Sequence, residues 1–87
     1  MKNIVKEFRL GELFCGPGGL ALGATTAKIE DSDYKIKHEW ANDYDQDTCN
    51  TYIRNICPDD SKSVICSDVR KLDIEKLGDI DALAFGF

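Results

Sequence analysis

A chain of 87 residues is long enough for one domain at most, and it buries only roughly 60% of the surface that its unfolded form exposes. The hydrophobic content of 43% excludes general disorder, and no apolar run approaches the roughly 20 residues that cross a bilayer. The net charge of −5 argues against nucleic-acid binding by this segment's own surface. The first seven residues lack the apolar stretch of a signal peptide, so a cytoplasmic protein without a membrane partner is expected.

The first predicted elements are a strand, a glycine-dense turn and a helix. The strand covers residues 8–14, and the charged residues 1–7 form a leader that is frayed or joins a neighbouring element. After the turn, apolar residues at i, i+4 and i+7 form one helical stripe that would face a sheet, namely Leu20, Ala24 and Ala27. This order of elements is typical of a nucleotide-binding α/β unit.

The turn between them holds Gly16, Gly18 and Gly19. Because glycine has no Cβ, the backbone can take positive φ and approach a ligand closely. The first amides of the following helix would face that ligand with the positive end of the helix dipole behind them, which favours an anionic group. The spacing G-x-G-G-x-x-x-G differs from the dinucleotide pattern G-x-G-x-x-G, so a purely structural turn is the alternative.

The second predicted strand begins at Tyr34, alternates apolar with charged residues, and ends at residues 41–43. Within it, His38 and Trp40 are interpreted as packing residues on the inner face. Asp45 is the expected N-cap of a second helix. Its apolar face carries Cys49, Ile53 and Ile56, with Tyr52 beside that face, and residues 58–61 end the helix.

The remaining elements complete an α/β pattern. A short third strand over residues 64–66 is followed by one or two helical turns over residues 72–77, and a fourth strand covers residues 80–87. The order βαβαβαβ predicts a mainly parallel sheet with right-handed crossovers and helices on both faces. Since a buried parallel strand is normally followed by another element, we expect residues 1–87 to be part of a single domain truncated after the fourth strand.

The four cysteines, at positions 15, 49, 57 and 66, are predicted to be free. They form no Cys-x-x-Cys pair, and His38 is the one histidine of the chain. Small core hydrophobes are therefore favoured over metal ligands, and no metal site is predicted. None of the thiols lies beside an obvious base in the sequence, so none is predicted to be a nucleophile.

Acidic residues follow the second and third predicted strands, and ligands of open parallel sheets lie outside the carboxyl ends of the strands. Asp43 could accept hydrogen bonds from two ribose hydroxyls, and Tyr44 offers a flat face to an adenine. Asp68 could accept from an exocyclic amine, with the Val69 amide beside it reading a ring nitrogen. The alternatives are that Asp43 starts a helix and that Asp68 forms a turn.

Three further charged residues lie near these strand ends in the sequence. Glu12 is either a partner for a ligand ammonium or a charge at the strand edge. Arg70 and Lys71 are interpreted as part of a solvated loop.

Four segments together resemble the motifs of the DNA (cytosine-5) methyltransferases, in that family's order. They are residues 12–19, 42–45, 67–69 and 81–87. The resemblance implies a Rossmann-like fold that uses S-adenosyl-L-methionine. It also implies a set of cofactor-binding residues: Phe14, Gly16, Gly18, Gly19, Leu20, Asp43, Tyr44, Asp68, Val69 and Phe85.

The sequence departs from the family pattern in two ways. Asp43 stands where the family more often has Glu, which shortens the reach to the ribose. The family's nucleophilic Cys would lie two residues beyond Phe87, so no catalytic residue is assigned and DNA would be contacted by other parts of a longer parent. We therefore expect a fragment of a cytoplasmic, bacterial or nucleoid-associated enzyme that binds the cofactor weakly and does not methylate.

Two other functions remain open from the sequence. A nucleotide-dependent oxidoreductase also combines a glycine turn with an acidic residue, although such a site gives Asp68 no role. A non-catalytic S-adenosylmethionine-binding or interaction module is the second alternative. The sequence predicts neither an oligomeric state nor a DNA recognition site.

Overall fold

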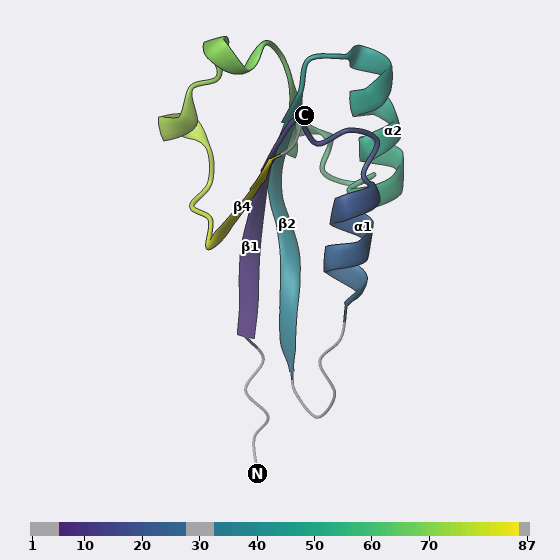
Figure 1. The fold of residues 1–87 in the computed structure, drawn as a ribbon, viewed down its shortest axis with the longest axis vertical. Helices are drawn as coiled ribbons and strands as arrows, with labels where there is room; N and C mark the ends of the chain where they lie inside the picture. Colours follow the sequence, from purple (N-terminus) through teal and green to yellow (C-terminus); the bar gives the residue numbers. More distant parts are fainter. Residues whose placement is uncertain (1–5, 28–32, 86–87) are drawn as a thin grey trace.

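The computed structural model describes residues 6–27 and 33–85, which form a four-stranded sheet with two α-helices packed on one face (Figure 1). The strands are all parallel and lie in the order β3-β2-β1-β4. Their bounds are β1 (Lys6–Leu13), β2 (Tyr34–Asp43), β3 (Val64–Cys66) and β4 (Ala82–Phe85). The predicted α/β fold with a parallel sheet is confirmed.

Two kinds of helix flank the sheet. The helices α1 (Gly19–Thr26) and α2 (Gln46–Ile56) cover one face, and the connection from β3 to β4 passes the other (Figure 1). That connection contains 3-10 turns, η2 (Val69–Lys71) and η3 (Ile74–Lys76), and a further turn, η1 (Ser61–Ser63), precedes β3. None of the helices in residues 6–27 and 33–85 is long and apolar enough to cross a membrane.

The one or two helical turns predicted over residues 72–77 are a single 3-10 turn, η3, which extended chain separates from η2 just before that range. The reason is the distance that residues 67–81 must cover. They return along the sheet and pass β2 and β1 before β4 begins. An α-helix advances about 1.5 Å per residue, whereas extended chain advances up to about 3.3 Å. Extended chain with short turns spans this path with the residues available.

The strand boundaries differ from the prediction at both ends of the chain. Lys6 and Glu7, assigned to the leader, belong to β1 and pair with Tyr34 and Lys35 of β2. The last strand begins at Ala82 rather than at residue 80. The predictions for residues 1–5, 28–32 and 86–87 lie outside the described part of the chain.

His38 and Trp40 do not share a face, because β2 contains a bulge. Leu10 pairs with His38 and the next residue of β1, Gly11, pairs with Trp40, so Glu39 is the extra residue. An extra residue reverses the alternation of side chains beyond it. His38 contacts α2, whereas the Trp40 indole donates to the Gly78 carbonyl at 3.0 Å on the opposite face. The expectation that both line the inner face was wrong.

Gly11 makes room for this tryptophan. A Cβ built on Gly11 would lie 2.7 Å from Cζ2 of Trp40, closer than real Cβ atoms come to other atoms. Gly11 is thus the residue of β1 that lets the indole cross this strand.

The buried face of α1 differs from the predicted one, whereas that of α2 agrees with the prediction. In α1 the buried residue is Ala21, whereas Leu20, assigned to the buried stripe, is 60% exposed and Ala27 lies just beyond the helix end. In α2, Cys49 and Tyr52 are buried and Ile53 and Ile56 pack against them. The predicted N-cap of α2 is confirmed, since the Asp45 carboxylate accepts from the Thr48 amide at 2.9 Å.

The cysteines lie in and around the core, as predicted. Cys15, Cys49 and Cys57 are buried, Cys66 is half-buried, and all four are free thiols. Burial raises the pKa of Cys15 and of Cys49 to about 12. These two thiols therefore stay protonated at neutral pH and pack as small apolar groups.

A chain of polar side chains crosses the buried space between α2 and the sheet. The Tyr52 hydroxyl donates to Glu12 Oε1 at 2.8 Å and lies 2.9 Å from His38 Nδ1. On the far side of the ring, His38 Nε2 lies 2.7 Å from the Ser63 hydroxyl, which donates to the Asp60 carbonyl. Burial raises the pKa of Glu12 and of Tyr52 and lowers the pKa of His38.

Replacing Tyr52 by Phe is expected to lower the free energy of unfolding by about 1–3 kcal/mol. The change leaves the buried Glu12 and His38 without the hydroxyl that satisfies both. Urea unfolding followed by circular dichroism measures the loss. Tyr44→Phe is the matched control, because Tyr44 is 80% exposed. Equal stabilities of the two variants would contradict the role given to the Tyr52 hydroxyl.

The Glu12→Gln variant isolates the proton equilibrium of Glu12. Because burial raises the pKa of Glu12 above its ordinary 4.5, the folded state holds that proton more tightly than the unfolded state. The contribution of Glu12 to stability is thus fully present below pH 4.5 and falls as the pH rises through the raised pKa. We expect the wild-type free energy of unfolding minus that of Glu12→Gln to decrease from pH 4.5 upward. A difference that is flat or increases with pH in urea titrations would contradict this sign.

Candidate functional site

The candidate site lies where β1, β2 and β3 end together at one edge of the sheet. The register places Leu13 opposite Asn42, and Asp43 opposite Cys66. A cavity of about 260 Å³ opens beside these strand ends. It is lined by Phe14, Asn42, Tyr44, Ser67, Asp68, Val69 and Arg70. Side chains from the three strand-end loops thus meet in one place, as the parallel topology predicts.

Asp43 joins the glycine turn to the start of α2. Its Oδ2 accepts from the Gly16 amide at 3.1 Å, and its Oδ1 accepts from the Asp45 amide at 3.1 Å. The Cys15 amide donates to the Asn42 carbonyl at 3.0 Å beside it. Because each carboxylate oxygen offers about two acceptor positions, Asp43 keeps capacity for two further donors.

The three glycines of the turn differ in why the structure accommodates glycine at each position. Gly16 and Gly18 have φ of 62° and 108°, a region that disfavours side chains. A Cβ on Gly18 would also lie 3.0 Å from Cγ1 of Ile56, so this glycine brings the turn against α2. Around Gly19 a Cβ would meet no atom within 4 Å, so this side of the turn faces open space.

The first amides of α1 face outward from the turn. The first intrahelical bond runs from the Leu22 amide to the Gly18 carbonyl at 2.8 Å, so the amides of Gly19 and Leu20 precede it. The Leu20 side chain is exposed at this helix end. The Gly16 amide, in contrast, is directed at Asp43 rather than at a ligand position.

Two aromatic residues border the cavity. Phe14 has a φ of 55°, a left-handed conformation that costs a residue with a side chain about 1 kcal/mol or more. Tyr44 is 80% exposed, which is unusual for so large an apolar surface. Both side chains line the space that a planar group would enter between the strand-end loops.

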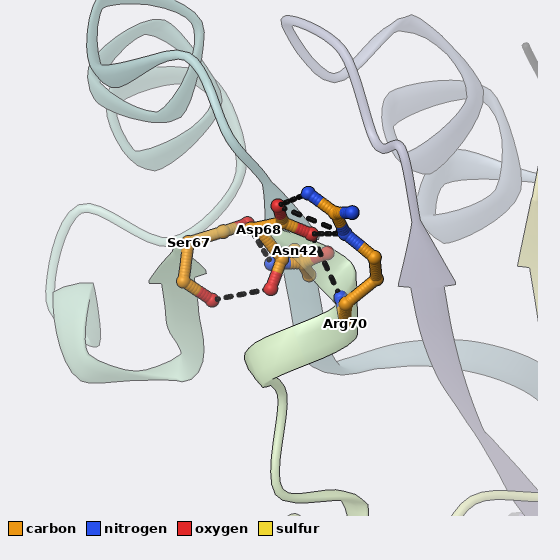
Figure 2. A network of polar contacts seen from close by, with 4 residues as sticks. All are labelled: Asn42, Ser67, Asp68 and Arg70. Atoms are coloured by element: carbon orange, nitrogen blue, oxygen red, sulfur yellow. Dashed lines mark hydrogen bonds and ion pairs between the residues drawn. The ribbon is translucent and has the colours of Figure 1, made fainter.

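Asn42 fixes the far wall of the cavity, and sequence reasoning gave it no role. Its side chain is buried and donates to the Ile65 carbonyl at 2.8 Å. It also donates to the Ser67 carbonyl at 3.0 Å (Figure 2). These bonds tie the end of β3 to β2. The sequence signal that could have identified Asn42 is its position, a polar residue between Ala41 and Asp43 at the end of a predicted strand.

Asp68 is bound by Arg70 (Figure 2). The guanidinium Nη2 lies 2.6 Å from Oδ2, and Nε lies 3.1 Å from Oδ1 and 3.2 Å from Oδ2. The backbone amide of Arg70 donates to Oδ1 at 2.9 Å, which makes Asp68 the cap of η2. Hydrogen bonds from Arg70 lower the pKa of Asp68 to about 2. Arg70 is exposed, as predicted for a solvated loop, but its ion pair with Asp68 was not predicted.

The other predicted positions lie around this centre. Phe85 ends β4 opposite Leu13, is 64% exposed, and is not among the residues that line the cavity. Glu12 is buried and bonded to Tyr52, so it is not an exposed charge at the strand edge. Within residues 6–27 and 33–85, no three His, Cys, Asp or Glu side chains are grouped to hold a metal ion.

Comparison with known proteins gives one family and two curated relatives. The model of the C-5 cytosine-specific DNA methylase family matches residues 8–87. The Type II methyltransferase M.BbvI of Brevibacillus brevis is 55% identical over 89 residues, covering 93% of this chain and 24% of the relative. The Type II methyltransferase M.Bsp6I of Bacillus sp. (strain RFL6) is 33% identical over 79 residues, covering 91% of this chain and 22% of the relative. The chain thus spans about a quarter of the length of these relatives, and no solved structure matches it.

Replacing Asp43 by Asn is expected to loosen the glycine turn. An Asn side chain keeps one acceptor oxygen, so either the Gly16 or the Asp45 amide loses its partner, at a cost of about 1 kcal/mol. Hydrogen exchange of the amide that loses its partner, Gly16 or Asp45, should become faster, as followed by NMR. Asp59→Asn, at an exposed turn position, is the control. Unchanged exchange at both amides would contradict the role of Asp43 in holding the glycine turn to the start of α2.

Proposed function

The chain belongs to the C-5 cytosine-specific DNA methylase family, and from that premise we propose that it forms the S-adenosylmethionine-binding part of a DNA cytosine-5 methyltransferase. The complete enzyme would transfer a methyl group to C5 of cytosine in DNA. The printed names of the relatives, both Type II methyltransferases, support that activity and a role in restriction and modification. The family match also favours this proposal over the oxidoreductase considered from the sequence.

The observation that carries the proposal is the cavity at the strand ends. Phe14 and Tyr44 border it and would hold the adenine between aromatic surfaces, and Asp68 and Val69 line the wall that would read the base edge. Asp43 lies next to it with acceptor capacity left for two ribose hydroxyls. The donors and acceptors of these residues fit an adenosine group. None of them is needed to bind a diphosphate.

The start of α1 would hold the amino-acid end of the cofactor. The amides of Gly19 and Leu20 precede the first intrahelical bond, and a carboxylate is favoured at such a helix end. Open space around Gly19 leaves room for its approach. The exposed Phe85, at the end of the neighbouring strand, would border the same edge.

The bound cofactor supplies an electrophilic methyl group on its sulfonium. The residues of this chain hold and orient the cofactor rather than attack the cytosine. The family's nucleophile follows a Pro, and the 87 residues contain no Pro-Cys pair. Burial raises the pKa of Cys15 and Cys49 to about 12, so neither supplies a thiolate at neutral pH. We therefore expect cofactor binding without methylation, and the net charge of −5 supports DNA contacts through residues outside these 87.

Isothermal titration calorimetry of the 87-residue chain tests this proposal. S-adenosylhomocysteine is expected to bind with a millimolar or lower Kd, and NAD to give no binding under the same conditions. Tyr44→Ala should weaken binding about tenfold, because stacking of a base on an aromatic side chain contributes about 1–3 kcal/mol. Ile74→Ala, a change at an exposed residue outside the cavity, is the control. Equal affinity for NAD, or an unchanged Kd in Tyr44→Ala, would contradict the proposal.

A further inference from the structure

We propose that Arg70 is an internal competitor for the base-reading carboxylate, so that a 6-aminopurine must displace its guanidinium before it can bond to Asp68. This inference rests on the proposed cofactor site and adds to it a residue that sets affinity and base selectivity. Arg70 lines the same cavity as Phe14, Tyr44 and Val69.

The competition follows from the acceptor capacity of Asp68. An ionised carboxylate offers about four acceptor positions on its two oxygens. The Asp68 carboxylate has four contacts, two on Oδ1 and two on Oδ2, and all come from three N–H groups of Arg70: its backbone amide, Nε and Nη2. Asp43, at the end of the neighbouring strand, receives only one donor on each oxygen. An exocyclic amine therefore finds acceptor capacity at Asp43 but must replace a contact at Asp68.

Arg70 is the partner that can leave. Asp68 is held in place, because it caps η2 through the Arg70 amide and follows Ser67, whose carbonyl is bound by the buried Asn42 (Figure 2). The Arg70 side chain is 85% exposed, so its guanidinium can move into solvent with little packing lost. Leaving removes three contacts to the carboxylate and retains the backbone cap.

The guanidinium also changes what the cavity wall presents to a base. With Arg70 in place the wall presents N–H donors, which suit the oxygen of a 6-oxopurine. With Arg70 displaced it presents a carboxylate, which suits the amine of a 6-aminopurine. Arg70 should therefore weaken the binding of adenosine compounds. It should also reduce the difference in affinity between adenosine and inosine compounds.

The test compares the wild-type chain with Arg70→Ala by calorimetry, with S-adenosylhomocysteine and S-inosylhomocysteine as probes. Lys71→Ala is the matched control, because it removes the same charge from the adjacent exposed residue of η2. Arg70→Ala should bind the adenosine compound about two- to fivefold more tightly, the range expected for loss of an exposed ion pair. It should bind the inosine compound no more tightly, so the ratio of the two Kd values increases. Lys71→Ala should leave that ratio unchanged.

A second readout follows the guanidinium itself. In wild-type chain, the NMR signal of the Arg70 Nε–H group should shift when S-adenosylhomocysteine is added, as its bonds to Asp68 are lost. Affinity for S-adenosylhomocysteine that is equal or weaker in Arg70→Ala, or an unmoved Nε–H signal at saturation, would overturn the competition while leaving the cofactor site intact. Absence of binding in wild type and every variant would instead overturn the proposed function, and the competition with it.

Discussion

The buried hydroxyl of Tyr52 holds the segments that form the glycine turn in their relative positions. It bonds to Glu12, two residues before the turn begins at Phe14, and contacts His38 of the neighbouring strand. The ring of the same tyrosine lies 3.4 Å from the position of a Cβ on Gly18, where the turn ends. One side chain of α2 therefore fixes the strand before the turn and packs against its last residue. The cavity beyond the turn depends on that arrangement.

The protons in this buried chain can be arranged without charge. When Glu12 is ionised, the Tyr52 hydroxyl donates to Glu12 Oε1. When Glu12 is protonated, this bond can reverse, so that Glu12 donates to the Tyr52 oxygen and Tyr52 donates to His38 Nδ1. His38 Nε2 then donates to Ser63, which donates to the Asp60 carbonyl. Burial shifts the pKa of Glu12 upward and that of His38 downward, and both shifts favour this neutral arrangement. A network with every member satisfied can be buried without an uncompensated charge.

Local signals predicted the features that depend on neighbouring residues in the sequence. The Asp45 cap depends on the Thr48 amide three residues away, and the order of strands and helices follows from periodicity. The bulge at Glu39 was not predictable in this way, because it is defined by how β2 pairs with β1. The Tyr52 hydroxyl can be buried because Glu12 and His38 are its hydrogen-bond partners. These partners are distant in the sequence, so the tyrosine itself gives no indication of them.

The two acidic residues of the candidate site show where sequence reasoning about the site stops. Asp43 and Asp68 follow neighbouring strands, and as residue types they predict the same acceptor chemistry. Asp43 is bonded by two neutral amides, which orient it and leave half of its acceptor positions open. Asp68 is bonded by a cation from the turn that follows it, which fills its acceptor positions and holds its pKa low. Asp43 thus keeps open acceptor positions, whereas the Asp68 carboxylate is occupied by the chain itself, and that difference arises from side-chain partners rather than from the residue type.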